Sequence, residues 1–565
     1  MARPNDPPAG SGPGLAALAF GLTLAVCAGT LLYNLDGGSL PNSDDPIYAS
    51  IAKEQADSGR WLEHRYLAAE IFEKPPLFFW LAAASIRTFG PGDFPVRLPA
   101  ALASLLLLTL VYLLAAPRPG GRHMAAGTSR FESPASAAGT PRPGGLSSPA
   151  GVAAGAVAAC FLLGTGEFFF NSRRVMTDLP FWLFALAFLA SLARAVSGQG
   201  SGAGRTGSSP ASASSRPAAA GPSRVWLLLS SLCMALAVLT KGPAFGPVAA
   251  AALLFLLLRR SWRSWTAADC LVLLLPALLV AGPWHAYMAW QHGTDFLGSY
   301  LGYHAVARVT SSLVGPTGPG FYLDQLVTGE GWHWALLMLA GLLTCLWHAV
   351  RGRSSLDVLL ALFVLLYAAL ISFMGTRLPH YVLPLYAISA LYVGRMASRL
   401  LRAFGRPLHR GICALVLLAL LSLGFASHNA YHLVSGDYSP DLKKLALLAR
   451  DTGAEIVAFN EYNVVSSWYA GVPVRAWSTD PQLCDTLRSI DMLRRCDFTW
   501  CPGRSAAVSE AIAAKRPAFL ARRASLPELL LLLPPSVRGS YRTLVSGASV
   551  ALLPVPRSTS AGPAR

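Results

Sequence analysis

The chain has 565 residues, of which 53% are hydrophobic and only 13% are charged. Its mean hydropathy of +0.45 is too high for a soluble protein of this length, so the composition indicates a lipid environment. A formal net charge of +17 could suggest nucleic-acid binding, but the distribution of the basic residues along the chain argues against it.

Long apolar runs dominate the first 430 residues. Crossing a hydrocarbon core takes roughly 20 apolar helical residues, and we identify about eleven such runs. They lie near residues 14–34, 97–116, 150–164, 179–197, 225–240, 243–258, 268–290, 333–350, 356–374, 381–399 and 410–427. Since several are short, we predict a polytopic α-helical membrane protein with about 11–13 transmembrane helices.

Arginines gather in alternate loops between these runs. The arginines that define the pattern are Arg118, Arg122, Arg130, Arg142, Arg194, Arg205, Arg216, Arg224, Arg259, Arg260, Arg263, Arg351, Arg353, Arg399, Arg402, Arg406 and Arg410. By the positive-inside rule these loops are cytoplasmic. Two of them, residues 118–149 and 198–223, are rich in Gly, Ser, Ala and Pro, which predicts flexible linkers. The positive charge therefore reflects topology, and we expect no nucleic-acid partner.

The remaining loops are then extracytoplasmic. They comprise residues 35–96, 165–178, the turn near Lys241, 291–332, 375–380, and everything after about Ser427. Almost every polar cluster that could carry chemistry falls in one of them. We therefore expect the functional site on the outer face of the membrane.

The carboxyl-terminal part has a different pattern from the apolar runs. Helices are predicted at 441–450 and 481–493, and strands at 455–459 and 472–477. We therefore divide the chain into a membrane domain, 1–430, and a small extracytoplasmic α/β domain, 437–565, which could simply cover the membrane site. The odd number of cysteines in this domain, Cys484, Cys496 and Cys501, allows one disulfide and one free thiol, with the pairing open.

The first outer loop carries acidic residues close to the ends of its flanking apolar runs. Asp44 and Asp45 follow the first run, and Glu73 and Lys74 precede Pro75, Pro76 and an aromatic stretch. Carboxylates at the membrane surface can bind a divalent cation, orient a sugar or accept a proton from a hydroxyl. Alternatively, Asp44 and Asp45 cap a helix that runs from about Pro46 to Ser58.

Several motifs in this order resemble the aminoarabinose transferases and related glycosyltransferases of the GT-C class, which include the protein mannosyltransferases. The matching residues of the first loop are Asp44, Asp45, Tyr48, Ala49, Phe72, Glu73, Lys74, Pro75 and Pro76, and further matches are FPVRLPAAL, RRVMTDLPF, LTKGP, GPWHAYMAW and RLPHYVLP. The resemblance spans roughly residues 15–400. Two departures are Ile47, where the family usually has Arg, and LAAEI, which replaces an Asn-Gly-containing stretch. The donor sugar or the acceptor could therefore differ from the family's.

The resemblance implies roles for particular residues. Asp44, with its neighbour Asp45, corresponds to the catalytic acidic pair, and Asp178 resembles a second acid of the site, although Asp178 could also cap the next helix. The candidates for binding the donor phosphate are Lys74, Lys241, Arg308 and Arg377. Each of these cations taken singly could instead extend to the membrane interface.

A metal site is also implied by the resemblance. His304 lies in a loop where the family has a metal-linked His, so Glu73 and His304 could hold a divalent metal ion. The alternative is that His304 is an ordinary exposed side chain. His380, in the RLPHY turn, is a weaker candidate for the site.

These features predict a glycosyltransferase of the bacterial inner membrane, whose site and carboxyl-terminal domain face the periplasm. The expected partners are a polyprenyl-phosphate-linked sugar donor, a lipid A-like or other cell-envelope acceptor, and membrane lipids. Inversion by single displacement is expected, with Asp44 as base if the acceptor is a hydroxyl. The alternative is a lipid or sugar transporter or flippase, for which inverted repeats would be expected but are not detected.

Overall fold

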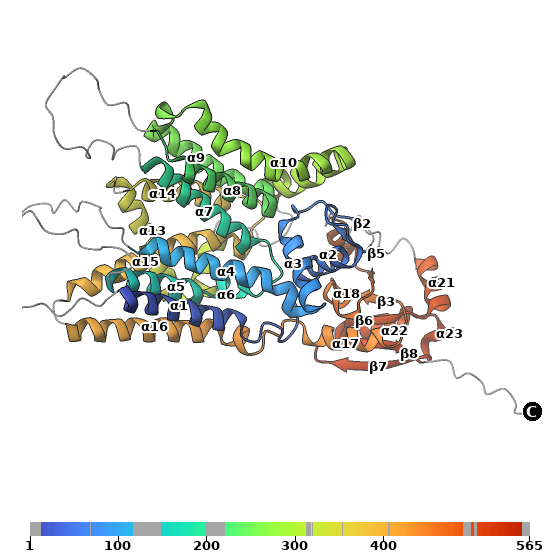
Figure 1. Cartoon of the computed structure of the whole chain (residues 1–565). Helices are drawn as coiled ribbons and strands as arrows, with labels where there is room; N and C mark the ends of the chain where they lie inside the picture. The colour runs from blue at the N-terminus through green and yellow to red at the C-terminus, as the bar shows by residue number, and fades with distance from the viewer. Residues whose placement is uncertain are drawn as a thin grey trace, which may run out of the picture.

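The computed structural model of the chain describes residues 13–67, 69–116, 149–197, 221–311, 318, 320–352, 354–404, 407–489, 499–501 and 505–555. A layer of long helices occupies one end of the molecule and a β-sheet domain the other, with the first outer loop between them (Figure 1). The predicted linkers 118–149 and 198–223 lie almost wholly outside the described residues.

All eleven apolar runs form helices. The helices of the membrane part are α1 (Pro13–Leu32), α4 (Asp93–Ala115), α5 (Pro149–Gly164), α6 (Gly166–Ser172), α7 (Asp178–Ser197), α8 (Arg224–Lys241), α9 (Gly246–Arg259), α10 (Ala267–Leu297), α11 (Arg308–Thr310), α12 (Phe321–Asp324), α13 (Trp332–Val350), α14 (Ser355–Phe373), α15 (Leu383–Ala403) and α16 (Pro407–Val434). The short 3₁₀ and π segments between them are η4 (Gly242–Phe245), η5 (Ser261–Ser264), η6 (Gly298–Ala307), η7 (Gln325–Gly329) and η8 (Pro379–Val382).

The chain is a multi-pass membrane protein. By length and composition, six helical stretches within the described residues can cross a membrane, or seven if the bent pair α5 and α6 counts as one span. This number is smaller than the 11–13 predicted, partly because the runs at 225–240 and 243–258 merge into one stretch, Arg224–Arg259. In addition, the apolar helix of the first run, Ala16–Leu32, is shorter than 18 residues, whereas each of the six stretches has at least 18.

The first outer loop is folded into its own small unit. It contains α2 (Asp44–Ser58), a hairpin of β1 (Arg65–Tyr66) and β2 (Ala69–Glu70), and α3 (Leu77–Phe89). Helix α2 ends at Gly59, whose φ of 73° lets its N–H bond to the carbonyl of Gln55. A buried apolar cluster joins α2 and α3 to Val464 and Val465 of the carboxyl-terminal part. The loop is thus packed between the membrane helices and the sheet domain.

The carboxyl-terminal part forms a six-stranded sheet of order β5-β4-β3-β6-β8-β7. Its strands are β3 (Ile456–Phe459), β4 (Val474–Trp477), β5 (Thr499–Trp500), β6 (Ala518–Arg522), β7 (Tyr541–Ser546) and β8 (Ser549–Pro554), and its helical segments are α17 (Pro440–Arg450), α18 (Val465–Ala470), α19 (Pro481–Ser489), α21 (Ser505–Lys515), η10 (Arg523–Ser525), α22 (Leu526–Leu532) and α23 (Pro535–Arg538). Strands β5, β4, β3 and β6 are parallel, so helical crossovers connect them and an α/β arrangement results, as predicted.

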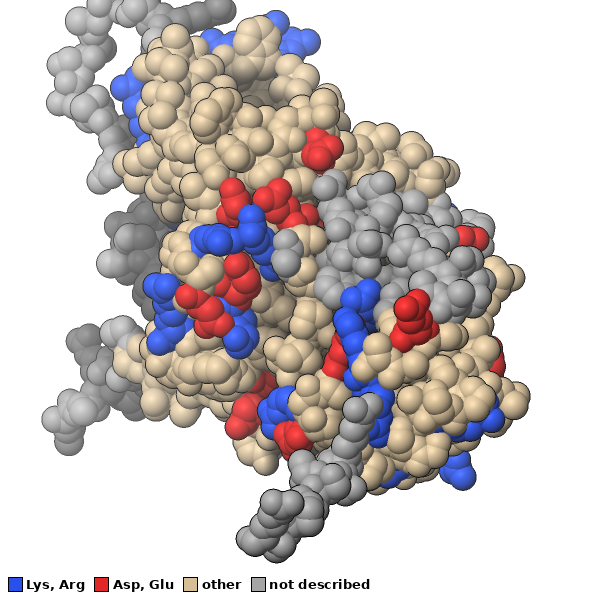
Figure 2. All heavy atoms as spheres, turned by 90° about the vertical axis from the view of Figure 1, so that its right-hand side faces the viewer, with Lys and Arg blue, Asp and Glu red and all other residues tan. Residues whose placement is uncertain are grey.

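Two further features of this domain bear on the sequence analysis. Cys484 and Cys501 form a disulfide, while Cys496 lies outside the described residues. Acidic and basic side chains are interspersed over the face that the carboxyl-terminal side presents (Figure 2). The described part of that face therefore has mixed charge rather than one continuous basic surface.

Candidate functional site

Asp44 and Asp45 occupy the first turn of α2, and neither is its N-cap. The N-cap is Ser43, which makes no side-chain capping hydrogen bond. The capping alternative therefore does not describe these two aspartates, although negative charge in a first turn still interacts favourably with the helix dipole.

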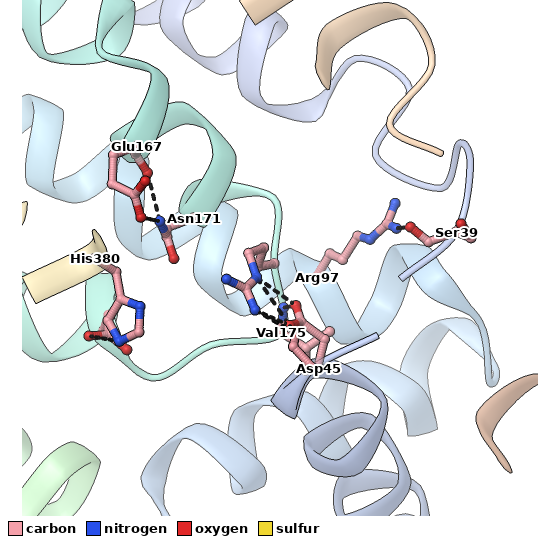
Figure 3. A network of polar contacts seen from close by, with 10 residues as sticks. Ser39, Asp45, Arg97, Glu167, Asn171, Val175 and His380 are labelled. Atoms are coloured by element: carbon pink, nitrogen blue, oxygen red, sulfur yellow. Dashed lines mark hydrogen bonds and ion pairs between the residues drawn. The ribbon is translucent and has the colours of Figure 1, made fainter. Parts of the chain in front are cut away.

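Asp45 is fully buried and saturated with hydrogen-bond donors. Arg174 donates to its carboxylate through Nε and Nη2, the shortest contact being 2.5 Å. The Val175 N–H donates at 2.8 Å and the Ser43 hydroxyl at 2.8 Å. Figure 3 shows the carboxylate of Asp45 turned toward Val175. This acid therefore joins the first outer loop to the segment before α7, and its oxygens are committed.

Asp44 is in the opposite situation. Within the described residues its carboxylate makes no hydrogen bond or ion pair. Burial raises its pKa, the charge of Glu73 raises it further, and the charges of Arg308, Lys74 and Arg174 lower it. Of the two adjacent aspartates, Asp44 is the one with oxygens available to a ligand, in a setting where a carboxylate can hold a proton.

Glu73 and Lys74 lie in a buried cluster beside Asp44. The Tyr48 hydroxyl donates to Glu73 at 3.3 Å, Lys74 Nζ lies 4.0 Å from Glu73 Oε2, and His304 Nε2 lies 3.5 Å from Glu73 Oε1. Burial lowers the pKa of Lys74 to about 8, with the charge of Glu73 acting in the opposite direction. The structure therefore brings together Glu73, Lys74 and His304, as predicted from sequence, and adds Tyr48.

The predicted metal site has two candidate protein ligands, Glu73 and His304. Glu73 and His304 can offer one oxygen and one nitrogen, but no group of three or more His, Cys, Asp or Glu side chains suited to a metal is present in the described part of the chain. Divalent cations such as Mg²⁺ often complete their coordination with substrate phosphate oxygens. A metal at Glu73 and His304 would need such additional ligands, so the metal remains a prediction.

Asp178 is the first residue of α7 and pairs with Lys241 at the end of α8. Lys241 Nζ donates to Asp178 Oδ1 at 2.6 Å, and His380 Nε2 lies 3.9 Å from the same oxygen. Among the described residues Asp178 Oδ2 has no hydrogen-bond partner. His380, which carried little weight in the sequence, therefore lies at the site beside a predicted acid.

A cavity of about 490 Å³ is lined by many of these groups, but Asp44, Tyr48 and His380 are not among its described lining residues. Its charged and polar lining consists of Glu73, Lys74, Asp178, Lys241, His304, Arg308 and Tyr381. Its lining also includes Trp182 of α7, Gly246, Pro247 and Ala250 of α9, and Leu366, Tyr367, Leu370, Ile371 and Met374 at the end of α14 and just after it. The cavity thus offers several cations to an anion and the side chains of spanning helices to an apolar chain.

One predicted residue lies away from the cavity, and two residues were missed. Arg377 is not among the described residues that line the cavity; it donates instead to the carbonyl of Ser372. Tyr381 does line it, with its hydroxyl 3.5 Å from Arg308 and its ring 5.9 Å from Lys241 Nζ. Tyr381 and Arg174 both fall within motifs recognised in the sequence, but only the fold reveals their partners.

Known proteins resemble this chain in sequence and in fold. A family model described as dolichyl-phosphate-mannose-protein mannosyltransferase matches residues 73–127. The undecaprenyl phosphate-alpha-4-amino-4-deoxy-L-arabinose arabinosyl transferase of Edwardsiella ictaluri is 28% identical over 70% of this chain and 64% of its own length. The enzyme of that name from Pseudomonas aeruginosa is 26% identical over 77% of this chain and 68% of its own length. The match to the first of these relatives therefore spans less than two thirds of its length.

Solved structures share the fold. The crystal structure of ArnT from Cupriavidus metallidurans bound to undecaprenyl phosphate superposes with a TM-score of 0.66 and 17% identity, covering 95% of this chain and 98% of that one. The archaeal oligosaccharyltransferase AglB from Archaeoglobus fulgidus gives 0.52 and 12%, covering 96% and 75%. The chain is thus similar in sequence to these arabinosyl transferases and shares the fold of ArnT and AglB.

Proposed function

We propose that the chain is a glycosyltransferase that moves a sugar from a polyprenyl-phosphate donor to a lipid A-like or other cell-envelope acceptor. The observation that carries the proposal is the lining of the cavity, which combines the cations Lys74, Lys241 and Arg308 with apolar side chains of spanning helices. A lipid phosphate likewise combines an anion with an apolar chain. The names of the two curated relatives and the undecaprenyl phosphate bound to the Cupriavidus protein support this choice of donor.

The chemistry follows from the charges. A sugar linked to polyprenyl phosphate carries its leaving group already, so the enzyme has to align the acceptor, neutralise the departing phosphate and exclude water. Lys74, Lys241 and Arg308 would neutralise the phosphate. The anomeric carbon would then exchange its bond to the phosphate oxygen for one to the acceptor oxygen, with inversion.

Asp44 would act on the acceptor. If the acceptor is a hydroxyl, Asp44 would accept its proton, which suits a carboxylate whose pKa is raised by burial. If it is a phosphate, no base is needed and Asp44 would orient the reacting groups. Asp45 is a weaker candidate for either role because Arg174, Val175 and Ser43 already occupy its oxygens.

Asp178 and the location of the site complete the proposal. Asp178 would hold Lys241 in place and leave Oδ2 available to the substrates. The arginine-rich loops alternate along the sequence with the loops that carry the motifs, and the positive-inside rule places the arginine-rich loops in the cytoplasm. The site and the domain from residue 437 onward would therefore face the periplasm. A divalent ion at Glu73 and His304 would add positive charge near the donor phosphate.

The direct test is a transfer assay with the purified full-length protein in detergent or vesicles. It is incubated with a set of polyprenyl-phosphate sugars, each carrying a radiolabelled sugar, and with a lipid extract as acceptor. We expect label to move from one donor to a lipid of the extract. Movement of the intact donor across the vesicle membrane, without transfer of its label to another lipid, would contradict the proposal and favour a flippase.

A further inference from the structure

The segment between α1 and Asp44, residues 33–43, contains no helix or extended strand, with one isolated bridge from Ser39 to Asp437. Its own secondary structure therefore does not fix the point at which α2, and with it Asp44, begins. Elements that contact this segment contribute to that placement, beside the contacts of α2 itself.

Arginines of the membrane part hold one side of the segment. Arg97 of α4, which is 2% exposed, donates to the carbonyls of Leu35, Gly37 and Ser39 at 2.8–2.9 Å. Figure 3 shows this side chain extended toward Ser39. Arg173, 3% exposed, donates to the carbonyls of Leu31, Tyr33 and Asn34. These contacts fix the beginning and middle of the segment, and Arg174 donates to the Ser43 hydroxyl at its end at 2.7 Å.

The carboxyl-terminal domain holds the other side. Ser39 donates to Asp437 at 2.5 Å, and the Leu40 N–H donates to the Tyr469 hydroxyl at 2.7 Å. Gly38, with a φ of 71°, lies so close to the main chain of Gly436 that a Cβ there would collide with its carbonyl. The domain is therefore fitted closely to the segment that leads to Asp44.

Among the hydrogen bonds that described residues of the carboxyl-terminal domain make to the segment, those to Asn42, two residues before Asp44, lie nearest to Asp44 along the chain. Asn42 Nδ2 donates to the Tyr462 carbonyl at 2.5 Å, and its Oδ1 accepts from the N–H groups of Val464 and Val465 at 3.0 and 3.2 Å. One amide side chain thus binds three main-chain groups in the loop between β3 and α18 and at the first residue of α18.

The same loop is close enough to Asp44 for the two to interact electrostatically. Burial raises the pKa of Tyr462, and the charge of Asp44 is the next contribution in the same direction. Val464 and Val465 pack in the apolar cluster that contains Tyr48 of α2. The loop at 460–465 therefore contacts both Asn42, two residues before α2, and the body of α2.

We propose that the loop at residues 460–465 of the carboxyl-terminal domain is a positioning element for Asp44, acting through the side-chain amide of Asn42. This inference rests on the proposed glycosyl transfer. A displacement of about 1 Å in a reacting geometry can cost roughly 10²-fold in rate, and the three bonds of Asn42 add the domain's hold on the segment to that of the arginines. The domain would then contribute to the rate and would not simply cover the site.

The test compares Asn42→Ala with Trp468→Phe in the full-length protein. Asn42→Ala removes all three bonds to the loop. Trp468→Phe removes one bond across the same interface, from the indole N–H to Asp93 at 2.9 Å, and keeps the hydrogen bonds of Asn42. The measured quantities are kcat, KM for the labelled donor, and thermal unfolding. If Asn42→Ala cannot be purified, Asn42→Ser, which keeps an oxygen acceptor and loses the amide donor, replaces it under the same criteria.

We expect Asn42→Ala to lower kcat roughly 10- to 100-fold with KM for the donor nearly unchanged, because the cations that bind the donor lie on other elements. Trp468→Phe should keep kcat within about threefold of wild type. The inference is overturned if Asn42→Ala keeps wild-type kcat, or if both variants lose activity in proportion to their loss of thermal stability. Absence of transfer by the wild type would instead refute the proposed function, so the two failures are distinguishable.

Discussion

Replacing Arg174 by methionine should destabilise the protein strongly, because it removes the partner of a buried carboxylate. Asp45 is 0% exposed and Arg174 is 9% exposed. The change removes the donations from Arg174 Nε and Nη2 to Asp45 and the 2.7 Å bond from Nη2 to the Ser43 hydroxyl. The Val175 N–H would be the main remaining compensation for the charge.

The expected magnitude is that of a broken buried ion pair. Removing one partner of such a pair costs about 3–5 kcal/mol, because the other charge remains buried. Asp45→Asn should also be costly, because it leaves the Arg174 guanidinium without its counter-charge. The double variant should cost less than the sum of the two single changes by about 0.5–3 kcal/mol, the range found for residues in direct contact.

The measurement is unfolding of the purified protein in mixed micelles by titration with a denaturing detergent, followed by tryptophan fluorescence, for the wild type, both single variants and the double variant. Strictly additive free energies of unfolding, or a loss below about 1 kcal/mol for Arg174→Met, would refute the structural role given to this pair.

Three further outcomes are expected. Lys74→Ala or Arg308→Ala should raise KM for the donor roughly 10- to 150-fold, since a charge-assisted bond contributes about 1.5–3 kcal/mol. Arg377 lies outside the described cavity lining, so Arg377→Ala serves as the control and should leave KM unchanged. Because the pKa of Lys74 is lowered to about 8, its ammonium loses its proton above that pH, so KM for the donor should rise from pH 8 to 9.5 in the wild type and stay nearly flat in Lys74→Arg; an equal rise in both would assign the effect to another group. Alkaline phosphatase fused after Ser435 should be active, and an inactive fusion would place the site on the cytoplasmic side.

The local features of the chain were predictable from the sequence. Each apolar run forms a helix, because a run of that length leaves few other ways to satisfy its backbone groups in lipid. The helix predicted at 441–450 is α17, Pro440–Arg450, and the strand predicted at 455–459 is β3, Ile456–Phe459. Glu73 and Lys74 were identified because their motif keeps its chemistry within a few adjacent residues.

The features that depend on distant contacts were not predictable. Nothing near Asp45 indicates that Arg174 would saturate it, since the two are 129 residues apart. The assignment of Asp44 and Asp45 as possible caps was wrong because the helix begins earlier, at Asp44, with Ser43 as its N-cap. Arg377 was grouped with the phosphate-binding cations by its side of the membrane, and side alone does not say which way a side chain points. The disulfide between Cys484 and Cys501 likewise required the fold.

The measurement that tests the central claim most directly is sugar transfer by Asp44→Asn beside donor binding by the same variant. The substitution keeps the size of the side chain and removes its charge, and Asp44 is not the N-cap, so helix α2 should form normally. We predict that labelled donor still binds to the variant while transfer to lipid falls about 10²- to 10⁴-fold, the range typical of general acid-base groups. Near-wild-type turnover in Asp44→Asn would contradict the account, because it would show that the one uncommitted carboxylate of the acidic pair takes no part in the reaction.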